Sequence, residues 1–343
     1  MAVPRPPVAP MLARGQAQIP RGGDWVYEPK WDGFRAIVFR DGDDLHMGSR
    51  NGQALERYFP ELRAPLLAGL APTCVVDGEI IIAGSGGLDF SALQSRIHPA
   101  ASRVKLLSAE IPATFIVFDL IGSGQDDLRS LPLRERRALC ETHVRANNQV
   151  AITPQTADAG LATSWFTLYE GAGLDGVVAK AAGGPYRSGD RGWVKIKHLR
   201  TVDCVVGGYR RAVAEAAIGS LLLGLYDQEG VLHHVGHTSS FSAAERREIL
   251  RQLHPLEGGE SFAGGRTPGG PSRWTRGRDA EWVPVTPSLV CEVAFDHLQG
   301  DRFRHASRFL RWRPDKPPAE CTYDQLTPPE TFSLSDVVDL GPG

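Results

Sequence analysis

Short apolar runs that end at glycine or at Asp-Gly recur along the first 200 residues, and they limit the possible folds more than any other feature. RAIVFRDG (35–42), CVVDGEIIIAG (74–84) and ATFIVFDLIG (113–122) are rich in Val, Ile and Phe. Such runs are typical of β-strands that end in turns. Farther along, Leu133, Leu139 and Val144 have helical spacing. We therefore expect residues 1–200 to form an α+β domain of antiparallel sheets and helices.

The sequence changes character after KIKHLRTVD (195–203). Short strand-like runs with glycine turns follow, and one segment, SAAERREILRQL (242–253), has the pattern of a helix. The strand-like runs are CVVGGYRR (204–211), GSLLLGLYDQEG (219–230), VLHHVGHTSS (231–240) and LVCEVAFDHLQ (289–299). Several short strands with one helix predict a small closed β-barrel of the OB-fold type over residues 201–325. Residues 326–343 show no apolar periodicity and are expected to form a C-terminal tail.

Composition excludes several other classes of protein. The chain has 343 residues, of which 42% are hydrophobic and 23% charged, and this suits a soluble protein of about two domains. No apolar run approaches the ~20 residues that a membrane span needs, and the proline-rich N-terminus lacks the apolar core of a signal peptide. Five scattered cysteines without a Cys-x-x-Cys pair predict reduced thiols and a cytoplasmic protein. The net charge of −2 gives no overall positive field, so contact with nucleic acid would need local basic clusters.

The stretch WVYEPKWDGFRAIVFRDG (25–42) places Lys30 between two carboxylates, Glu28 and Asp32. A lysine amine is a nucleophile only when it is unprotonated, and additional positive charge nearby favours that form. WVKIK supplies Lys195 and Lys197, which are two residues apart on an expected strand and so share one face. Two cations on one face suggest an anion between them, and phosphate is the natural candidate. Lys30 taken alone is more simply a surface lysine in an ion pair.

Several carboxylates interrupt otherwise apolar strands. Glu79 lies in VVDGEIII, Asp119 follows Phe118, and Asp175 and Lys180 lie at the two ends of an apolar patch. Buried carboxylates are costly unless they are paired or bind a metal. Together with the lysines, this pattern suggests a pocket for a nucleotide and a divalent metal. We interpret Asp77, in the same run as Glu79, as the first residue of an Asp-Gly turn.

Seven motifs in a fixed order resemble those of the covalent nucleotidyltransferases, which act through a lysyl-nucleotide intermediate. The resemblance extends from about Pro7 to Pro318, and PMLAR with EPKWDGFRA is most similar to small bacterial ATP-dependent DNA ligases of the LigC type. One such motif would be weak evidence, whereas the ordered set is specific. The motifs are KWDGFR (30–35), SRNG (49–52), VVDGEII (75–81), FIVFDL (115–120), LDGVVAK (174–180), WVKIK (193–197) and RFLRWRPDKPP (308–318).

The resemblance implies a role for each matching residue at the nucleotide. Lys30 would attack the α-phosphate of ATP and form a phosphoramide with AMP, while Lys195 and Lys197 would bind that phosphate. Glu28 and Arg35 would hold the adenine and ribose ends of the nucleotide.

The same resemblance assigns the remaining residues. Arg50 would meet the 5′-phosphate of a nick, Phe118 would stack on adenine, and Lys180 would lie near the α-phosphate and ribose. Arg313, with Asp315 and Lys316, would orient the pyrophosphate leaving group. Glu79 would contact ribose or the shell of Mg²⁺ or Mn²⁺, which Asp175 would help to hold. The family usually has glutamate at the position of Asp175, so the shorter side chain could make metal ligation water-mediated.

The expected partner is nicked double-stranded DNA, held through phosphate contacts. The basic run RFRHASRFLRWRPDK (302–316), YRSGDRGWVKIKHLR (186–200) and the Gly-, Pro- and Arg-rich loop over 257–279 are the candidate surfaces. The resemblance suggests a monomer without a separate N-terminal DNA-binding domain, nucleoid-associated and active in DNA repair. A repair polymerase or an end-binding protein would then be a candidate partner.

Two other functions fit parts of the pattern. An RNA-end ligase or GTP-using capping enzyme would share Lys30, Glu79 and the paired lysines, and a non-catalytic DNA-end-binding scaffold would keep the fold. EPKWDGFRA argues against the former, and the intact set of reactive residues argues against the latter. His233, His234 and His237 fit a zinc site poorly, because adjacent strand residues point to opposite faces.

Overall fold

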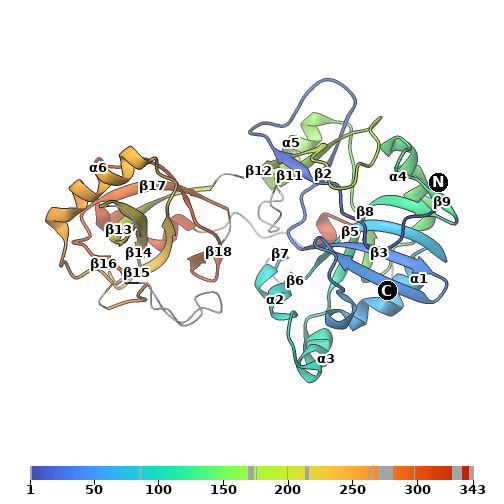
Figure 1. The fold of residues 1–343 in the computed structure, drawn as a ribbon, viewed down its shortest axis with the longest axis horizontal. Helices are drawn as coiled ribbons and strands as arrows, with labels where there is room; N and C mark the ends of the chain where they lie inside the picture. The colour runs from blue at the N-terminus through green and yellow to red at the C-terminus, as the bar shows by residue number, and fades with distance from the viewer. Residues whose placement is uncertain are drawn as a thin grey trace. The chain divides into compact units, whose positions relative to one another are not determined.

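The chain forms two compact units in a computed structural model (Figure 1). One unit comprises residues 1–198 with 328–343, and the other comprises residues 199–327. The residues that the structure describes are 2–84, 87–168, 174, 176–198, 200–212, 216–262, 264–268, 281–296, 298–326 and 334–339.

The first unit is built on two main sheets. The smaller sheet has the strand order β1-β12-β11-β2, and the larger has the order β10-β8-β5-β3-β4 with β9 added to β8. The smaller sheet comprises β1 (Ala13–Gly15), β2 (Trp25–Pro29), β11 (Gly176–Ala181) and β12 (Trp193–Lys197). The larger comprises β3 (Phe34–Asp41), β4 (Asp44–Ser49), β5 (Thr73–Ile81), β8 (Thr114–Ser123), β9 (Asp126–Asp127) and β10 (Val150–Ile152). A short hairpin joins β6 (Ala83–Gly84) to β7 (Gly87–Leu88).

Five α-helices accompany these sheets among the described residues of the first unit. The predicted helical spacing is confirmed, because α4 spans Leu133–His143 and Val144 is its C-cap. The helices are α1 (Arg63–Gly69), α2 (Phe90–Ser95), α3 (Ala101–Glu110), α4 (Leu133–His143) and α5 (Ala159–Leu168), with short 3₁₀ turns η1 (Glu56–Tyr58), η2 (Pro60–Leu62) and η6 (Leu334–Asp336).

Most ladders of the first unit are antiparallel, as predicted, but each main sheet also contains one parallel pair. β1 is parallel to β12, and β10 is parallel to β8. The second pair arises because the chain crosses over through α4 after β8 and returns in the same direction, and parallel neighbours need such a crossover. The other ladders in these two sheets are antiparallel.

The larger sheet is buried on both faces, which explains why its strands are continuous apolar runs rather than alternating ones. Val76 and Phe115 belong to a cluster with residues of α1 and α4. Ile37 and Phe118 belong to a second cluster, together with Trp193 of the smaller sheet. The space between the two sheets is therefore lined by side chains from strands far apart in the sequence.

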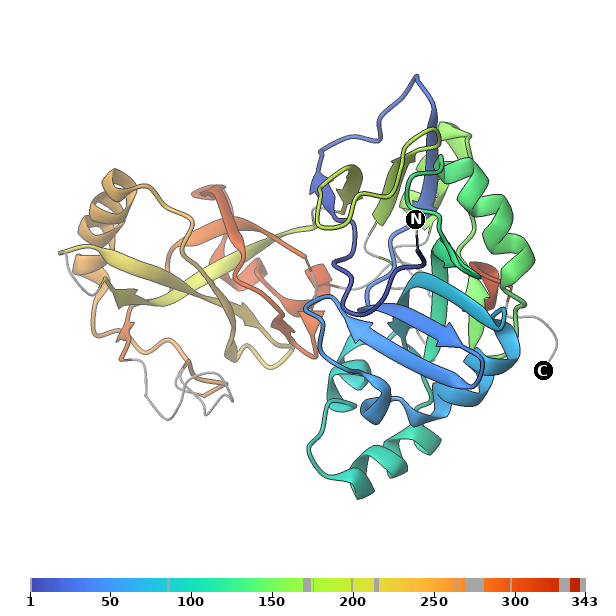
Figure 2. The ribbon, with the colours of Figure 1, turned by 45° about the vertical axis from the view of Figure 1, so that its right-hand side comes forward.

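The second unit contains an antiparallel sheet with the order β15-β14-β13-β17-β20 and β16 added to β13 (Figure 2). A single parallel bridge, Thr238 to Ser307, joins the outer strands. Among the described residues no ladder closes the sheet, so the structure does not show the predicted closed barrel. The strands are β13 (Arg200–Arg211), β14 (Ile218–Tyr226), β15 (Leu232–Thr238), β16 (Val283–Pro284), β17 (Val290–Phe295), β18 (Leu298–Gln299), β19 (Arg302–Phe303) and β20 (Arg308–Trp312).

The helix predicted in this unit is present as α6 (Ala243–Leu253). Ser242 accepts a hydrogen bond from the Glu245 backbone N–H, and the Glu245 carboxylate accepts one from the Ser242 backbone. This reciprocal pair satisfies amide groups that have no partner within the helix, so it fixes where the helix begins. Further 3₁₀ turns are η3 (His254–Leu256), η4 (Pro318–Glu320) and η5 (Tyr323–Leu326).

The five cysteines are buried and none forms a disulfide. No helix in the described ranges is long and apolar enough to cross a membrane.

Candidate active site

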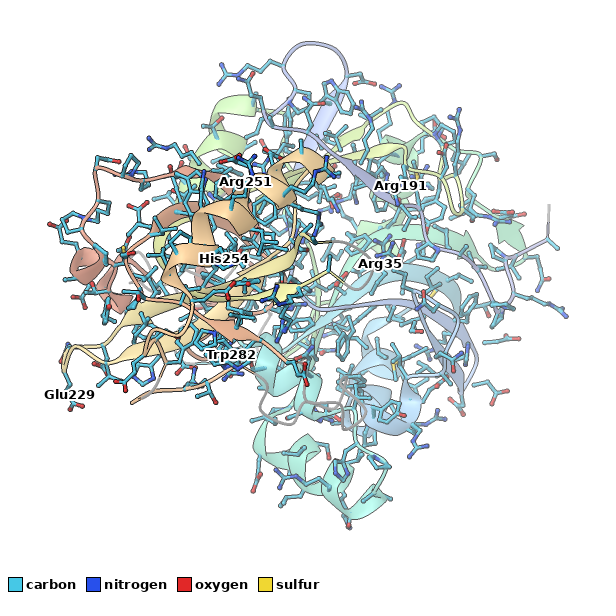
Figure 3. All side chains as sticks on the ribbon, turned by 60° about the vertical axis from the view of Figure 1, so that its left-hand side comes forward. Arg35, Arg191, Glu229, Arg251, His254 and Trp282 are labelled. Atoms are coloured by element: carbon cyan, nitrogen blue, oxygen red, sulfur yellow. The ribbon has the colours of Figure 1, made fainter. Side chains whose placement is uncertain are left out.

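A cavity of about 290 Å³ in the first unit is lined by both main sheets. Its lining combines cationic, anionic and aromatic side chains, and Figure 3 labels two of them, Arg35 and Arg191. Nine residues predicted from the sequence line this cavity: Glu28, Lys30, Arg35, Arg50, Glu79, Phe118, Lys180, Lys195 and Lys197.

Strand register explains how the lysines of the cavity come together. Trp193, Lys195 and Lys197 are alternate residues of β12, so their side chains lie on the same face of the strand. All three line the cavity. Lys197 lies opposite Gly176 of β11, and the Gly176 carbonyl accepts a hydrogen bond from the Lys30 backbone N–H at 2.9 Å. Lys30 and Lys197 therefore flank the same glycine, one on each side.

Gly176 permits this close approach because no larger residue fits there. Its φ is +135°, and a Cβ atom would lie 2.0 Å from the Ile196 carbonyl oxygen. Both the conformation and the space exclude a side chain. The glycine in the motif LDGVVAK is therefore needed for steric reasons.

Glu28 and Lys180 form a buried ion pair at one side of the cavity. The Lys180 Nζ lies 2.6 Å from Glu28 Oε2, and the exposed fractions of the two side chains are 2% and 3%. Gln155 Nε2 donates to Glu28 Oε1 at 2.8 Å, and Lys180 Nζ also donates to the Phe118 carbonyl at 3.2 Å. Each Glu28 carboxylate oxygen has a partner, so the group is fixed in orientation.

Arg35 is held by a buried carboxylate. Its Nε and Nη2 donate to the two oxygens of Asp77 at 2.5 and 2.6 Å, and the Tyr186 hydroxyl donates to Asp77 Oδ2 at 2.6 Å. Burial raises the pKa of Tyr186 well above its usual value, and the neighbouring Asp77 carboxylate adds to the increase. The interpretation of Asp77 as a turn residue is wrong, since it lies within β5 and is fully buried. A carboxylate beside glycine resembles a turn in the sequence, but its partner Arg35 is on the neighbouring strand.

Two cations of the cavity lie close to the ring of Phe118. The Arg35 guanidinium is 4.5 Å and the Lys180 Nζ is 4.7 Å from the centre of its ring. Trp193 contacts the same ring edge-to-face, with 6.0 Å between the centroids and 82° between the planes. Phe118 is only 7% exposed, so the aromatic pair forms a wall of the cavity rather than a protruding surface.

Glu79 is the carboxylate of the cavity that best fits a cation. Burial raises the pKa of Glu79 to about 7, a shift opposed by Arg35 and Lys30 and reinforced by Asp32 and Asp77. A cation bound to this carboxylate would favour its charged form. Mg²⁺ in nucleotide sites commonly uses one or two carboxylates together with substrate phosphates, so a single carboxylate here is compatible with such a metal. The described part of the chain contains no group of three His, Cys, Asp or Glu residues suited to a metal, and Asp175 lies outside it.

Comparison with known proteins decides the family. Residues 10–197 match the model of the ATP dependent DNA ligase domain, and residues 214–316 match that of the ATP dependent DNA ligase C terminal region. The chain is 50% identical to DNA ligase C of Mycobacterium tuberculosis, with 97% of each chain covered. It is 48% identical to DNA ligase C1 of Mycolicibacterium smegmatis, with 98% of each covered. The chain belongs to the ATP-dependent DNA ligase family.

Structural comparison agrees with this family at the level of the fold. A solved structure of a Lig E DNA ligase superimposes with a TM-score of 0.54 and 17% sequence identity, covering 89% of this chain and all of the other. The resemblance to small LigC-type ligases and the assignment as an ATP-dependent DNA ligase are thus confirmed. The nucleotidyltransferase fold is confirmed as one of mixed sheets and helices.

Three residues predicted to act on pyrophosphate, Arg313, Asp315 and Lys316, lie in the second unit. Arg313 Nη1 donates to both oxygens of Asp203 at 2.9 Å, and its Nη2 donates to Asp315 at 2.9 Å. Lys316 donates to Glu320 at 2.8 Å. Both cations are therefore engaged by carboxylates of their own unit.

The sequence analysis missed three polar or aromatic groups of the site. Trp193 lines the cavity and could have been found, because it precedes Lys195 by two residues on the same strand. Gln155 donates a hydrogen bond to Glu28, and Tyr186 donates one to Asp77. The two residues of each pair are more than 100 positions apart in the sequence. No local pattern marks them.

The interpretation that His233, His234 and His237 fit a zinc site poorly stays a prediction. His234 is buried, and no described residue bonds to either of its ring nitrogens. His233 is paired with Asp227 at 2.7 Å, as an ordinary surface interaction.

Proposed function

We propose that this ligase seals nicks in double-stranded DNA through a covalent lysyl-AMP intermediate. One observation carries the proposal: Lys30, Lys195 and Lys197 line a single cavity with Arg35 and Glu79. Three amines around one cavity suit the α-phosphate of ATP, and one of them, at the edge of β2, is the candidate nucleophile.

In the first step, the Lys30 Nζ attacks the α-phosphorus of ATP, a P–N bond forms, and pyrophosphate leaves. Lys195 and Lys197 attract the phosphate oxygens and offset charge that develops there. Mg²⁺ or Mn²⁺, when held by Glu79 and Asp175 together with ATP oxygens, would neutralise further phosphate charge.

The adenosine end of ATP is proposed to lie against Glu28, Arg35 and Phe118. A carboxylate oxygen of Glu28 accepts from the adenine amino group, and the wall formed by Phe118 and Trp193 supplies an apolar surface for the base. Lys180 lies near the α-phosphate and ribose in this scheme. The Glu28–Lys180 pair supports this, because it holds the acceptor in place beside the cavity.

In the second step, a 5′-phosphate oxygen at the nick attacks the AMP phosphorus, and the Lys30 P–N bond breaks. Arg50 is proposed to hold that 5′-phosphate. In the third step, the 3′-hydroxyl attacks the activated 5′-phosphate, a phosphodiester forms, and AMP leaves. The leaving group is good because its charge is shared by phosphate oxygens near the lysines.

We further infer an adenylation domain over residues 1–200 and an OB-fold domain over residues 201–325. The six-stranded antiparallel sheet, α6 and the match of residues 214–316 to the C-terminal region of the family support the second assignment. Arg313 and Lys316 of that domain are proposed to orient pyrophosphate, after exchanging their present carboxylate partners for phosphate.

The proposed substrate is bound mainly through its phosphates, by basic runs such as 302–316. A monomer acting in DNA repair, in association with the nucleoid and with a repair polymerase or end-binding protein, is the cellular setting we infer from the LigC relatives.

The test uses α-labelled ATP and GTP on protein first freed of bound AMP with pyrophosphate. The expected result is label from ATP that survives denaturation but is released by acid hydrolysis, no label from GTP, none in Lys30→Ala, and transfer of the label to nicked DNA without further ATP. Label from GTP would favour a capping-type enzyme, and absence of label from both nucleotides would favour a non-catalytic scaffold.

A further inference from the structure

The C-terminal segment, residues 334–339, packs into the first unit although the whole second unit precedes it in sequence. η6 begins at Leu334, and Val337 and Val338 follow with exposed fractions of 6% and 4%. Figure 2 shows the short red helix of this segment among the strands of the first unit. Two consecutive buried valines need a specific apolar surface, since an unbound tail would leave them in water.

That surface includes Trp31, the residue next to the proposed nucleophile. Val337 and Val338 share one apolar cluster with Trp31 and Leu174. Trp31 follows Lys30, and Leu174 precedes Gly176 by two residues. The remaining members are buried strand residues or partly buried ones: Ile81, Ile116, Ala151, Leu88 and Leu334.

The cluster therefore contains a residue close to the donor and a residue close to the acceptor of one hydrogen bond. The Lys30 backbone N–H donates to the Gly176 carbonyl at 2.9 Å, and this bond continues the β2–β11 ladder beyond the pair of Pro29 with Val177. Trp31 connects Lys30 to the cluster, and Leu174 connects Gly176 to it. The Trp31 indole is also fixed at its other edge, because Nε1 donates to the buried Thr153 hydroxyl at 2.9 Å.

We propose that the C-terminal segment is a positioning element for Lys30, which completes the apolar cluster that holds Trp31 and Leu174. This rests on the proposed role of Lys30 as nucleophile. Loss of Val337 and Val338 from the cluster exposes Trp31 and Leu174, so the main chain at Lys30 and Gly176 gains freedom. Attack at the α-phosphorus requires close alignment, and a displacement of about 1 Å can cost about 100-fold in rate.

The adenosine end of the cavity is held by different contacts. Glu28 is fixed by Lys180 and Gln155, and Arg35 is fixed by Asp77. None of these residues belongs to the cluster of the C-terminal segment. Removing the valines should therefore lower the rate of attack far more than the affinity for ATP.

The experiment measures single-turnover adenylation of the full chain over a range of ATP concentrations, without DNA. The test variant is Val337→Asp with Val338→Asp, and Ser335→Asp is the matched control because it adds charge in the same segment at an exposed position. Val337→Ile is the conservative variant. All are assayed well below their melting temperatures, after removal of bound AMP.

The expected result for the double variant is a saturating rate at least about tenfold lower, with the half-saturating ATP concentration changed less than about threefold. The control and the conservative variant keep the rate within about twofold. Hydrogen exchange should also be faster in the peptide that contains Trp31.

An unchanged saturating rate in the folded double variant would overturn the proposal. A rate that falls only in proportion to the unfolded fraction would overturn it too. If the aspartates prevent folding, Val337→Ala with Val338→Ala is measured by the same two criteria. Failure of the proposed function is distinguishable, because the unaltered protein would then take no label at all.

Discussion

Arg35 shows how much of this site depends on a few buried polar contacts. Its guanidinium faces the cavity and the aromatic rings, while Asp77 and Tyr186 behind it are buried. The Tyr186 hydroxyl accepts from the Met11 backbone N–H at 2.9 Å and donates to Asp77 at 2.6 Å. One hydroxyl thus links the N-terminal segment to the carboxylate that orients Arg35.

Tyr186→Phe should destabilise the protein by about 1–3 kcal/mol, because it leaves the Met11 N–H and one Asp77 oxygen without this partner in a buried place. The free energy of unfolding from urea titration measures the effect. Tyr226→Phe is the control, since it removes a hydroxyl from a half-buried tyrosine of the second unit. Equal stability of the two variants would show that water replaces the Tyr186 hydroxyl at no cost.

At the scale of elements, the site depends on β11 lying close to both β2 and β12. Gly176→Ala places a Cβ 2.0 Å from the Ile196 carbonyl at a φ of +135°. We expect the strands to separate, and adenylation to fall by about 100-fold as the lysines move apart. Single-turnover labelling measures this rate.

Gly189→Ala is the matched control for the glycine experiment. Its φ of +77° is also positive and so also disfavours a side chain, but a Cβ there meets nothing within 4 Å. It should lose about 1 kcal/mol of stability and keep the adenylation rate. If Gly176→Ala retained the rate of this control, close contact of β11 and β12 would not be needed for the chemistry.

The strands and their charged residues could be predicted from the sequence, because glycine-bounded apolar runs and two-residue spacing are local patterns. The parallel pairs could not, since the pairing of β10 with β8 depends on a crossover through α4. Asp77 was assigned to a turn because its partner Arg35 is distant in sequence. The C-terminal valines form no periodic pattern, so only the assembled cluster reveals their role.

At the scale of the whole molecule, acid should weaken the protein partly through His234 in the second unit. Burial lowers the pKa of His234 from its usual 6.5 to about 3, and the neighbouring Arg302 and Arg210 add to the decrease. At pH values between these two pKa values, the unfolded chain therefore binds a proton at His234 more readily than the folded chain does. This contribution to stability is complete above about pH 6.5 and is lost as the pH falls toward 3.

His234→Phe keeps a ring in contact with Phe262 but cannot titrate. Between pH 6.5 and 4.5 we expect the unaltered protein to lose about 2–3 kcal/mol more unfolding free energy than this variant. Chemical denaturation of the full chain at several pH values measures it, with the exposed His254→Gln as control. Parallel pH curves for wild type and His234→Phe would contradict the expectation.

Of the three lysines of one cavity, Lys30 is the residue proposed to carry AMP. Peptide mass mapping after incubation with ATP and Mg²⁺ tests this directly, since it locates the added mass of one AMP on the chain. We expect AMP on the peptide containing Lys30, sensitive to acid and removed by pyrophosphate, with Lys195 and Lys197 unmodified. AMP on Lys195 or Lys197, or label that persists in Lys30→Ala, would contradict it.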